Sequence, residues 1–267
     1  MEEKIFNNFR DLIYNASGIS LGPNKVELLT ARVAKRMRLL GIPEHSDYFK
    51  VVVDDKSGKE LGELLNAIST NVTHFFREEI HFKFLADRIQ ELNDSDATSF
   101  RIWCAASSSG EEPYSIAITV LENLKKNILV EIIASDISTK VLHMAKNGVY
   151  RDSDVKTINK DILKKYFQVG TGRAAGFYKV KDNLKKMVQF KQINLSTPPF
   201  PIKGDLDLIF CRNVMIYFND TLKKHLVDNF SSILKPTGYL IVGLSESLTG
   251  KSENLKLVNS SIYSRKN

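Results

Sequence analysis

Apolar and polar residues are spaced differently in the first and second parts of this chain. Up to about residue 70 the apolar positions recur at helical spacing, and the pattern predicts helices over residues 26–40, 46–53 and 61–68 behind a first helix. From about residue 100, short apolar runs alternate with helical segments, which is typical of a parallel sheet covered by helices. We therefore expect an all-α domain over residues 1–70 and an α/β domain over residues 71–267.

One strand–turn–helix stretch of the second domain is the best candidate for a ligand site. Residues 100–105 form an apolar run that predicts a buried strand, and residues 106–110 are all small, so another molecule could approach the backbone there. Glu111, Glu112 and Pro113 then mark the start of a helix. The stretch predicts the first half of a nucleotide-binding βαβ unit.

The two glutamates change which ligand is expected at this turn. The G-x-G-x-x-G pattern that a pyrophosphate normally requires is missing, which disfavours a NAD-dependent oxidoreductase. A helix N-terminus attracts anions, but Glu111 and Glu112 would repel one, by roughly 4 kcal/mol for a charge pair near 4 Å. A nucleoside that carries positive charge fits better, and S-adenosylmethionine is one. The alternative is an ordinary helix start with acids favoured by its dipole.

Further strands are predicted along the α/β domain. Residues 130–135 are apolar and end in Asp136, and an acid after the second strand commonly binds ribose hydroxyls. Residues 206–211 predict another buried strand. Residues 238–244 and 257–263 are expected to form a closing hairpin.

A small antiparallel β-insertion is predicted at about residues 166–193. Residues 177–180 and 187–192 alternate in polarity on either side of a polar turn, which favours a hairpin. A glycine-rich turn precedes them, and it lacks the strand–helix context of a phosphate loop. This turn contains Gly170, Gly172 and Gly176.

Charge and composition narrow the partners. The net charge is +7, which favours an acidic partner surface. The second predicted helix carries four cations within seven residues, which indicates either such a partner or a solvated charged face. These cations are Arg32, Lys35, Arg36 and Arg38.

The sequence also indicates the cellular compartment and whether a metal site is expected. The chain opens on no signal peptide and has no long apolar run, so we expect a cytoplasmic protein without membrane insertion. Cys104 and Cys211 lie in apolar strand patterns, which favours reduced core thiols. The five histidines show no metal-ligand spacing with cysteines or acids, and we expect no metal site.

Five blocks of residues, in order, resemble one known family. They are N-V-T-H-F-F-R from Asn71, W-C-A-A-S-S-S-G-E-E-P-Y-S from Trp103, A-S-D ending at Asp136, I-F-C-R-N-V-M-I-Y-F from Ile209 and G-L-S-E-S from Gly243. This series is similar to the CheR-type chemoreceptor methyltransferases, and the similarity runs through nearly the whole chain. Ser109 stands where many relatives carry threonine, a swap that retains the hydroxyl.

The resemblance implies a fold and an activity. The fold would be a Rossmann-like, doubly wound S-adenosylmethionine-dependent methyltransferase sheet with the β-insertion, preceded by the helical domain. The activity would be protein-glutamate O-methylation, in which S-adenosylmethionine is converted to S-adenosylhomocysteine and glutamates of chemotaxis receptors become methyl esters during adaptation. The partners would be receptor cytoplasmic helices, facing the basic helix, and a receptor C-terminal peptide at the β-insertion, where Gly170, Gly172 and Gly176 would be binding positions. The alternative for the insertion is a mobile surface hairpin without a ligand. A monomer is expected.

The resemblance also implies residue roles. Glu111 would bind the methionyl ammonium, with Glu112 as a neighbour, and Arg77 and Tyr217 would lie at the methyl-transfer centre. A glutamate carboxylate is already nucleophilic at neutral pH, so the protein has mainly to orient it, and the Arg77 guanidinium can bind both of its oxygens. The positions implied to contact the cofactor are Asn71, Thr73, Arg77, Glu111, Asp136, Asn194, Leu195, Arg212 and Asn213.

Two other functions stay open at this point. A nucleic-acid methyltransferase would use the positive charge, but it usually needs aromatics that stack on the target base, and the aromatics here read mostly as core. A non-catalytic receptor-binding module would tolerate loss of the acidic cofactor residues, yet Glu111 and Asp136 are present. For Arg77 and Tyr217 the structural alternatives are a linker ion pair and a core aromatic.

Overall fold

The first part of the chain folds into helices that share one core. The computed structural model describes residues 1–69, 71–202, 204–248, 250 and 252–266. Phe9, Ile13, Val33 and Leu64 are fully buried together in this helical unit. Its elements are α1 (Glu3–Ser17), η1 (Pro23–Lys25), α2 (Val26–Leu40), α3 (His45–Asp54) and α4 (Lys59–Ile68). The bounds predicted for α2 are confirmed.

A seven-stranded sheet organises the second part of the described chain. The strand order is β6-β2-β1-β7-β8-β10-β9, and β6 through β8 are parallel while β10 and β9 add an antiparallel edge. The predicted fold class is therefore confirmed. The strands are β1 (Ser99–Cys104), β2 (Leu129–Asp136), β6 (Val188–Gln192), β7 (Leu206–Cys211), β8 (Leu234–Val242), β9 (Leu255–Asn259) and β10 (Ile262–Arg265).

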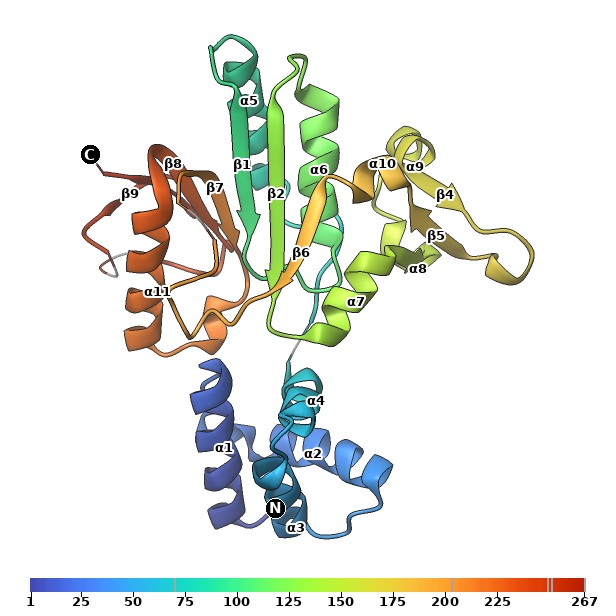
Figure 1. Ribbon diagram of the computed structural model, residues 1–267, viewed down its shortest axis with the longest axis vertical. Coiled ribbons are helices and arrows are strands. Elements are labelled where there is room, and N and C mark those ends of the chain that lie inside the picture. Colours follow the sequence, from blue (N-terminus) through green and yellow to red (C-terminus); the bar gives the residue numbers. More distant parts are fainter. Residues whose placement is uncertain (70, 203, 249, 251, 267) are drawn as a thin grey trace.

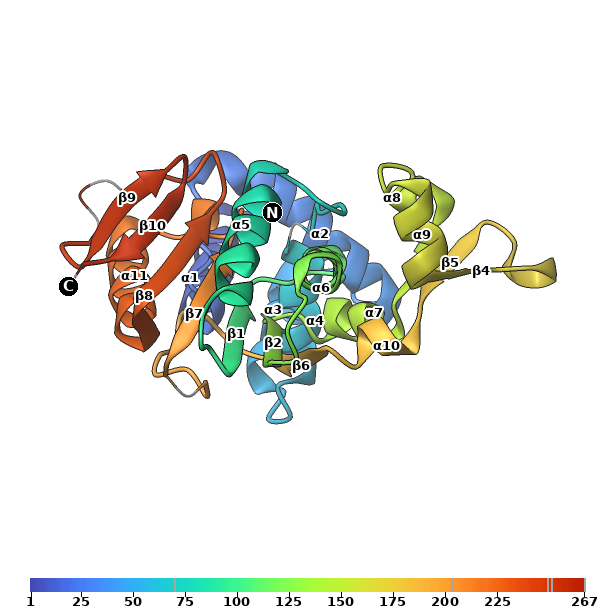
Figure 2. The same ribbon diagram turned by 90° about the horizontal axis from the view of Figure 1, so that it is seen from above.

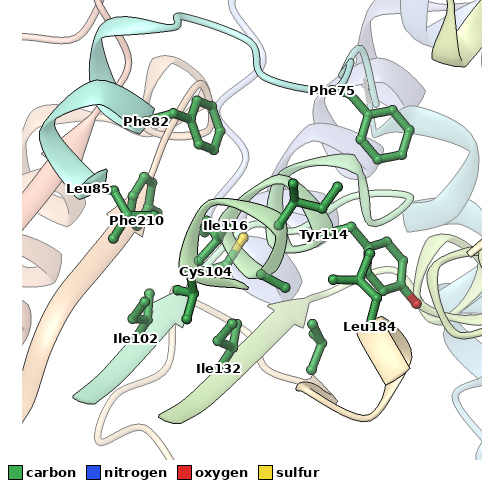
Figure 3. Packing of buried hydrophobic residues seen from close by; sticks show 14 of the residues in the cluster. Phe75, Phe82, Leu85, Ile102, Cys104, Tyr114, Ile116, Ile132, Leu184 and Phe210 are labelled. Atoms are coloured by element: carbon green, nitrogen blue, oxygen red, sulfur yellow. The ribbon is translucent and has the colours of Figure 1, made fainter. Parts of the chain in front are cut away.

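Helices cover both faces of this sheet because successive strand residues point to opposite sides. On β1, Ile102 and Cys104 pack under α5 (Ile80–Asn93) and α6 (Glu111–Asn123), as Figure 3 shows. Trp103, one position along, is buried on the other face with Phe230 of α11 (Asp220–Ile233). A further helix, α7 (Thr139–Asn147), follows β2 and contacts β2 and β6.

The strand order places the site. The chain runs outward from β1 to β2 and β6 and then crosses back to β7 on the other side of β1. In such doubly wound sheets ligands bind where the order reverses, beyond the carboxyl ends of the strands. In Figure 1 these ends of β1 and β2 point toward the helical unit, so the helical unit faces the place where a ligand would bind.

The predicted β-insertion exists, but one of its strands was assigned wrongly. Residues 188–192 form β6, which pairs in parallel with β2 of the main sheet rather than with residues 177–180. The expected polar turn between them is the short helix α10 (Asp182–Lys185). Alternating polarity marks a strand with one buried face, but it does not identify the strand beside it.

The insertion itself is a three-stranded antiparallel sheet with the order β3-β5-β4. It projects sideways from the main sheet (Figure 2). Its elements are β3 (Val149–Arg151), α8 (Asp152–Val155), α9 (Lys160–Tyr166), β4 (Phe167–Val169), η2 (Gly172–Ala174) and β5 (Phe177–Val180).

The closing hairpin was also placed wrongly. β9 and β10 form the hairpin, and β8 pairs antiparallel with β10. The predicted strand over residues 257–263 thus contains a turn, at which Ser261 has a φ of 61°. In the described residues no helix has both the length and the apolar character needed to cross a bilayer, and no group of three or more His, Cys, Asp or Glu side chains is placed to hold a metal ion.

Candidate functional site

A cavity of about 350 Å³ lies between the carboxyl ends of the parallel strands and the helical unit. Its volume is within the range of small-molecule sites, roughly 300–1,000 Å³. Residues far apart in the sequence meet there because the turns after β1, β2 and β7 share one edge of the sheet. The predicted site residues that line it are Asn71, Thr73, Arg77, Asp136, Asn194, Leu195, Arg212, Asn213 and Tyr217.

The turn between β1 and α6 forms one wall of the cavity. Gly110 has a φ of 102°, and an added Cβ would lie 2.8 Å from the Tyr150 hydroxyl, so this position favours glycine. Ser108 has a φ of 46°, and its N–H donates to Asp136 Oδ2 at 2.9 Å. Ser108 lines the cavity, and its buried hydroxyl has no hydrogen-bond partner in the described chain.

Asp136 ends β2 with its carboxylate fixed by backbone groups. The N–H of Ser108 and the N–H of Ser138 donate to its two oxygens, each at 2.9 Å. Burial raises the pKa of the Asp136 carboxyl, and these hydrogen bonds oppose the shift only in part. The ionised carboxylate therefore costs free energy in the protein without ligand, a cost that a donor on a bound ligand would reduce.

The two glutamates at the start of α6 have different surroundings. Glu111 is 7% exposed, and burial raises its pKa. The Ser109 hydroxyl donates one hydrogen bond that the two carboxylate oxygens of Glu111 share, at 2.7 and 3.0 Å. Glu111 is not among the described residues that line the cavity. Glu112 does line it, and its carboxylate is paired with Arg212 at 2.6 Å. The pair neutralises Glu112, whereas Glu111 has no cation beside it in the described chain.

Arg212 is a buried cation that joins three parts of the site. Its side chain is 1% exposed and pairs with Glu112 and, at 3.1 Å, with Glu78. It also donates to the carbonyl of Arg77 and lies over the Phe82 ring at 5.7 Å. Burial alone would raise the pKa of Glu78, but Arg212 and hydrogen bonds outweigh it and hold that pKa below its usual value.

Sequence reasoning missed two carboxylates near the cavity. Glu78 directly follows the block that ends at Arg77, and it accepts hydrogen bonds from Arg212 and Asn213. Glu246 lies in the G-L-S-E-S block, which carried the resemblance without a role being assigned to this residue. Position inside or beside a matching block was the available signal for both.

Arg77 and Tyr217 both line the cavity. The Arg77 guanidinium donates to the carbonyl of Val72 at 2.8 Å, and its side chain is 30% exposed, so part of it can meet a substrate. Tyr217 ends η3 (Met215–Tyr217), and its carbonyl accepts from the N–H of Ser20 in the helical unit at 2.8 Å. The helical unit is thereby attached to the site.

The structure separates the predicted substrate-binding cations. Arg36 forms two hydrogen bonds of 2.8 Å with Glu60, and Arg32 donates to the carbonyl of Ala67 at 2.9 Å. Both therefore serve packing of α2 against α4. Lys35 and Arg38 are exposed and remain available to a partner. Gly170, Gly172 and Gly176 lie on the insertion, which Figure 2 shows away from the helical unit.

Comparison with known proteins agrees with this arrangement. Residues 4–69 match the family model described as "CheR methyltransferase, all-alpha domain", and residues 71–264 match "CheR methyltransferase, SAM binding domain". Chemotaxis protein methyltransferase 2 of Pseudomonas aeruginosa is 40% identical over 260 residues, covering 97% of this chain and 92% of that protein. The chemotaxis protein methyltransferase of Salmonella typhimurium is 37% identical over 259 residues, covering 97% and 88%.

The raised pKa of Glu111 predicts how stability depends on pH. A carboxyl whose pKa is higher in the folded than in the unfolded protein lowers the free energy of unfolding as pH rises through that folded pKa. Glu111→Gln removes this cost, and we expect the ligand-free variant to be more stable than wild type by about 0.5–2 kcal/mol at about pH 8. The difference should shrink toward about pH 4.5, measured by urea unfolding.

Glu122 provides a control of opposite sign. The Lys165 ammonium and the Tyr166 hydroxyl donate to its carboxylate and lower its pKa, so Glu122→Gln should not gain stability at about pH 8. A Glu111→Gln variant less stable than wild type at that pH would contradict the electrostatic account of Glu111.

Proposed function

The chain belongs to the CheR methyltransferase family, and we propose that it transfers the methyl group of S-adenosylmethionine to glutamate side chains of chemotaxis receptors, giving glutamyl methyl esters. The observation that carries the cofactor assignment is the pair of buried carboxylates Glu111 and Asp136, both with raised pKa and neither paired with a cation in the described chain. Glu111 begins α6 after the turn that follows β1, and Asp136 is the last residue of β2, so both lie at the edge of the sheet where a nucleoside binds in this fold. A ligand with an ammonium and ribose hydroxyls supplies the missing partners.

Each end of the cofactor has candidate contacts. The Glu111 carboxylate binds the methionyl ammonium, for which it must exchange its hydrogen bond with Ser109. Asp136 accepts from the ribose hydroxyls, and Asn194 and Leu195 lie beside the adenine. Asn194 also donates to the carbonyl of Ala16 at 2.8 Å, so cofactor contact and attachment of the helical unit involve the same side chain.

The chemistry asks the protein mainly for orientation. S-adenosylmethionine supplies the methyl group and a sulfonium whose sulfur keeps the electron pair of the broken S–CH₃ bond. Arg77 holds the substrate carboxylate by both oxygens so that one of them lies in line with the methyl group. Tyr217 orients the same carboxylate through its hydroxyl. No proton has to be removed, because the glutamate is already ionised at neutral pH.

The alternative functions find less support. Of the residues that line the cavity, Tyr217 and Phe218 are aromatic, whereas Phe75 and Phe82 are buried in the core and cannot stack on a flipped base. A non-catalytic module has no need of two desolvated carboxylates, Asp136 in the cavity and Glu111 next to the turn that forms one of its walls, and the relatives that cover nearly the whole chain carry the name of methyltransferases.

Two substitutions test the cofactor site. Asp136→Ala should weaken binding of S-adenosylhomocysteine about 10- to 100-fold, because it removes charge-assisted hydrogen bonds worth roughly 1.5–3 kcal/mol. Glu111→Gln should weaken S-adenosylmethionine binding while the fold is retained. Titration calorimetry measures both. Asp207→Ala is the matched control, since Asp207 pairs with Lys235 at the opposite end of the sheet. Wild-type affinity in both test variants would exclude this site.

The exposed cations of α2 are the candidate contact with an acidic receptor helix. Lys35→Glu together with Arg38→Glu should slow methylation about 10-fold at low salt and reduce its salt dependence, since rim charges act mainly on association. The affinity for S-adenosylhomocysteine should not change. The control is Lys125→Glu with Lys126→Glu, the same charge change in the loop before β2. Equal methylation rates in both double variants would contradict a receptor contact at α2, and its cations would then only be solvated.

The β-insertion is the candidate site for a receptor C-terminal peptide. Residues 140–192 hold 13 lysines and arginines but 4 aspartates, while the rest of the chain has 25 cations and 27 acids. An anionic peptide is therefore drawn to the insertion rather than to the remainder of the surface. In the order β3-β5-β4 the outer strands β3 and β4 each have one side without a neighbouring strand in the described chain, where an extended peptide can add. A tether of this kind raises the effective concentration of substrate.

The hairpin glycines test this proposal. Gly172 and Gly176 have φ of 56° and 84°, so valine at both positions strains the turn and should abolish peptide binding while cofactor binding is retained. Gly58→Val is the control, because Gly58 has a φ of 68° in the helical unit. Titration with peptides from the receptors of the same organism provides the measurement. No binding by the wild-type protein would exclude the tether.

A further inference from the structure

The segment after β7 carries three residues of the candidate site without belonging to a strand. Arg212, Asn213 and Tyr217 line the cavity, Asn213 has a φ of 58°, and η3 begins only at Met215. A positive φ is uncommon for a residue with a side chain and persists where the surroundings impose it. The groups that hold this backbone therefore decide where three site residues point.

The Glu246 carboxylate holds the backbone of the segment after β7 in place. Glu246 is 7% exposed and accepts the backbone N–H of Asn213 and of Gly243, both at 2.7 Å. Its other oxygen accepts the N–H of Ile216 at 3.3 Å. Hydrogen bonds to a buried carboxylate are short and strong. One side chain thus ties the end of β8 to both ends of the segment that leads to Tyr217.

Gly243 leaves the space that this arrangement needs. A Cβ at residue 243 would lie 2.5 Å from Asn213 Nδ2 and 2.8 Å from Glu246 Oε2, closer than non-bonded atoms approach. A larger residue would therefore push the carboxylate or Asn213 from its place. Glycine is favoured here because a residue without a Cβ lets Asn213 and Glu246 come this close. Its backbone N–H also donates to Glu246.

Glu78 holds the same segment from the other side. Its carboxylate accepts from the side chains of Arg212, at 3.1 Å, and Asn213, at 3.2 Å, and from the N–H of Leu244 at 3.1 Å. Glu78 thus binds side chains of the segment, and Glu246 binds the backbone of the segment. Both carboxylates also bind the residues directly after β8.

We propose that Glu246 is a positioning residue for methyl transfer, which sets the backbone of residues 212–217 so that Asn213 and Tyr217 point into the cavity. This rests on the proposed function. Glu246 is not among the described residues that line the cavity, so it acts through the segment and not on the reacting atoms. Its loss should reduce the rate of the chemical step more than the binding of cofactor, because Glu111 and Asp136 stand on other elements.

Glu246→Gln tests the proposal, since it retains length but replaces an acceptor with an amide N–H₂ beside three donors. We expect kcat at saturating cofactor and receptor fragment to fall about 10- to 100-fold, the scale of small misplacements in a site. The Kd for S-adenosylhomocysteine should stay within about threefold. Asp207→Asn is the matched control, because Asp207 binds the N–H of Arg101 and Lys235 near the other end of β7, and its kcat should stay near wild type.

A second variant keeps the test decisive if Glu246→Gln folds poorly. Gly243→Ala should lower kcat in the same way, whereas Gly62→Ala should not, since an added Cβ there meets nothing within 4 Å. Wild-type kcat in both Glu246→Gln and Gly243→Ala overturns the proposal, as does a loss no larger than the loss of folded protein seen by circular dichroism. A wild-type protein that methylates no receptor fragment refutes the proposed function instead.

Discussion

The buried cation Arg212 is the interaction on which the site depends. Removing a guanidinium from water is tolerable only where carboxylates and hydrogen bonds compensate for the lost hydration, and here Glu78, Glu112 and the carbonyl of Arg77 do so. These partners come from the segment before α5 and the start of α6, so one ion cluster fixes the relative position of elements far apart in the sequence. It also distinguishes the two glutamates: Glu112 is paired with Arg212, whereas Glu111 has no cation beside it in the described chain.

This difference has a thermodynamic consequence. Glu111 and Asp136 are desolvated without a cation in the described chain, so the ligand-free protein bears a cost that a bound ligand removes. Part of the cavity wall belongs to the helical unit, which is attached through Asn194 and Tyr217. A ligand that binds only the assembled cavity therefore stabilises the contact between the two parts of the chain as well as the site itself. Ligand binding in the cavity and the placement of helix α2 are linked for this reason.

Local signals in the sequence predicted local structure well, and partners distant in the chain were predicted poorly. The bounds of α2 follow from apolar spacing and from Gly41, and Ser108, Gly110 and Asp136 follow from a short strand–turn–helix pattern. The neighbour of β6 was missed because a half-buried strand looks the same at the edge of either sheet. Arg36 was taken for a free cation, although Glu60, 24 positions away, binds it. Glu78 and Glu246 were overlooked because their partners lie across the fold.

The electrostatic layout follows from these same contacts. Around the cavity, the charged side chains have fixed partners: Arg212 is paired with two carboxylates, and the Glu246 carboxylate accepts from backbone N–H groups. The excess positive charge lies instead over residues 140–192, in and around the β-insertion. A site whose side chains are held in place suits a reaction in which orientation is the main requirement, because bound groups then meet fixed partners. A charged periphery suits recruitment of an anionic partner, because long-range attraction acts before contact. The residues that orient bound groups are thus different from the residues whose charge attracts a partner.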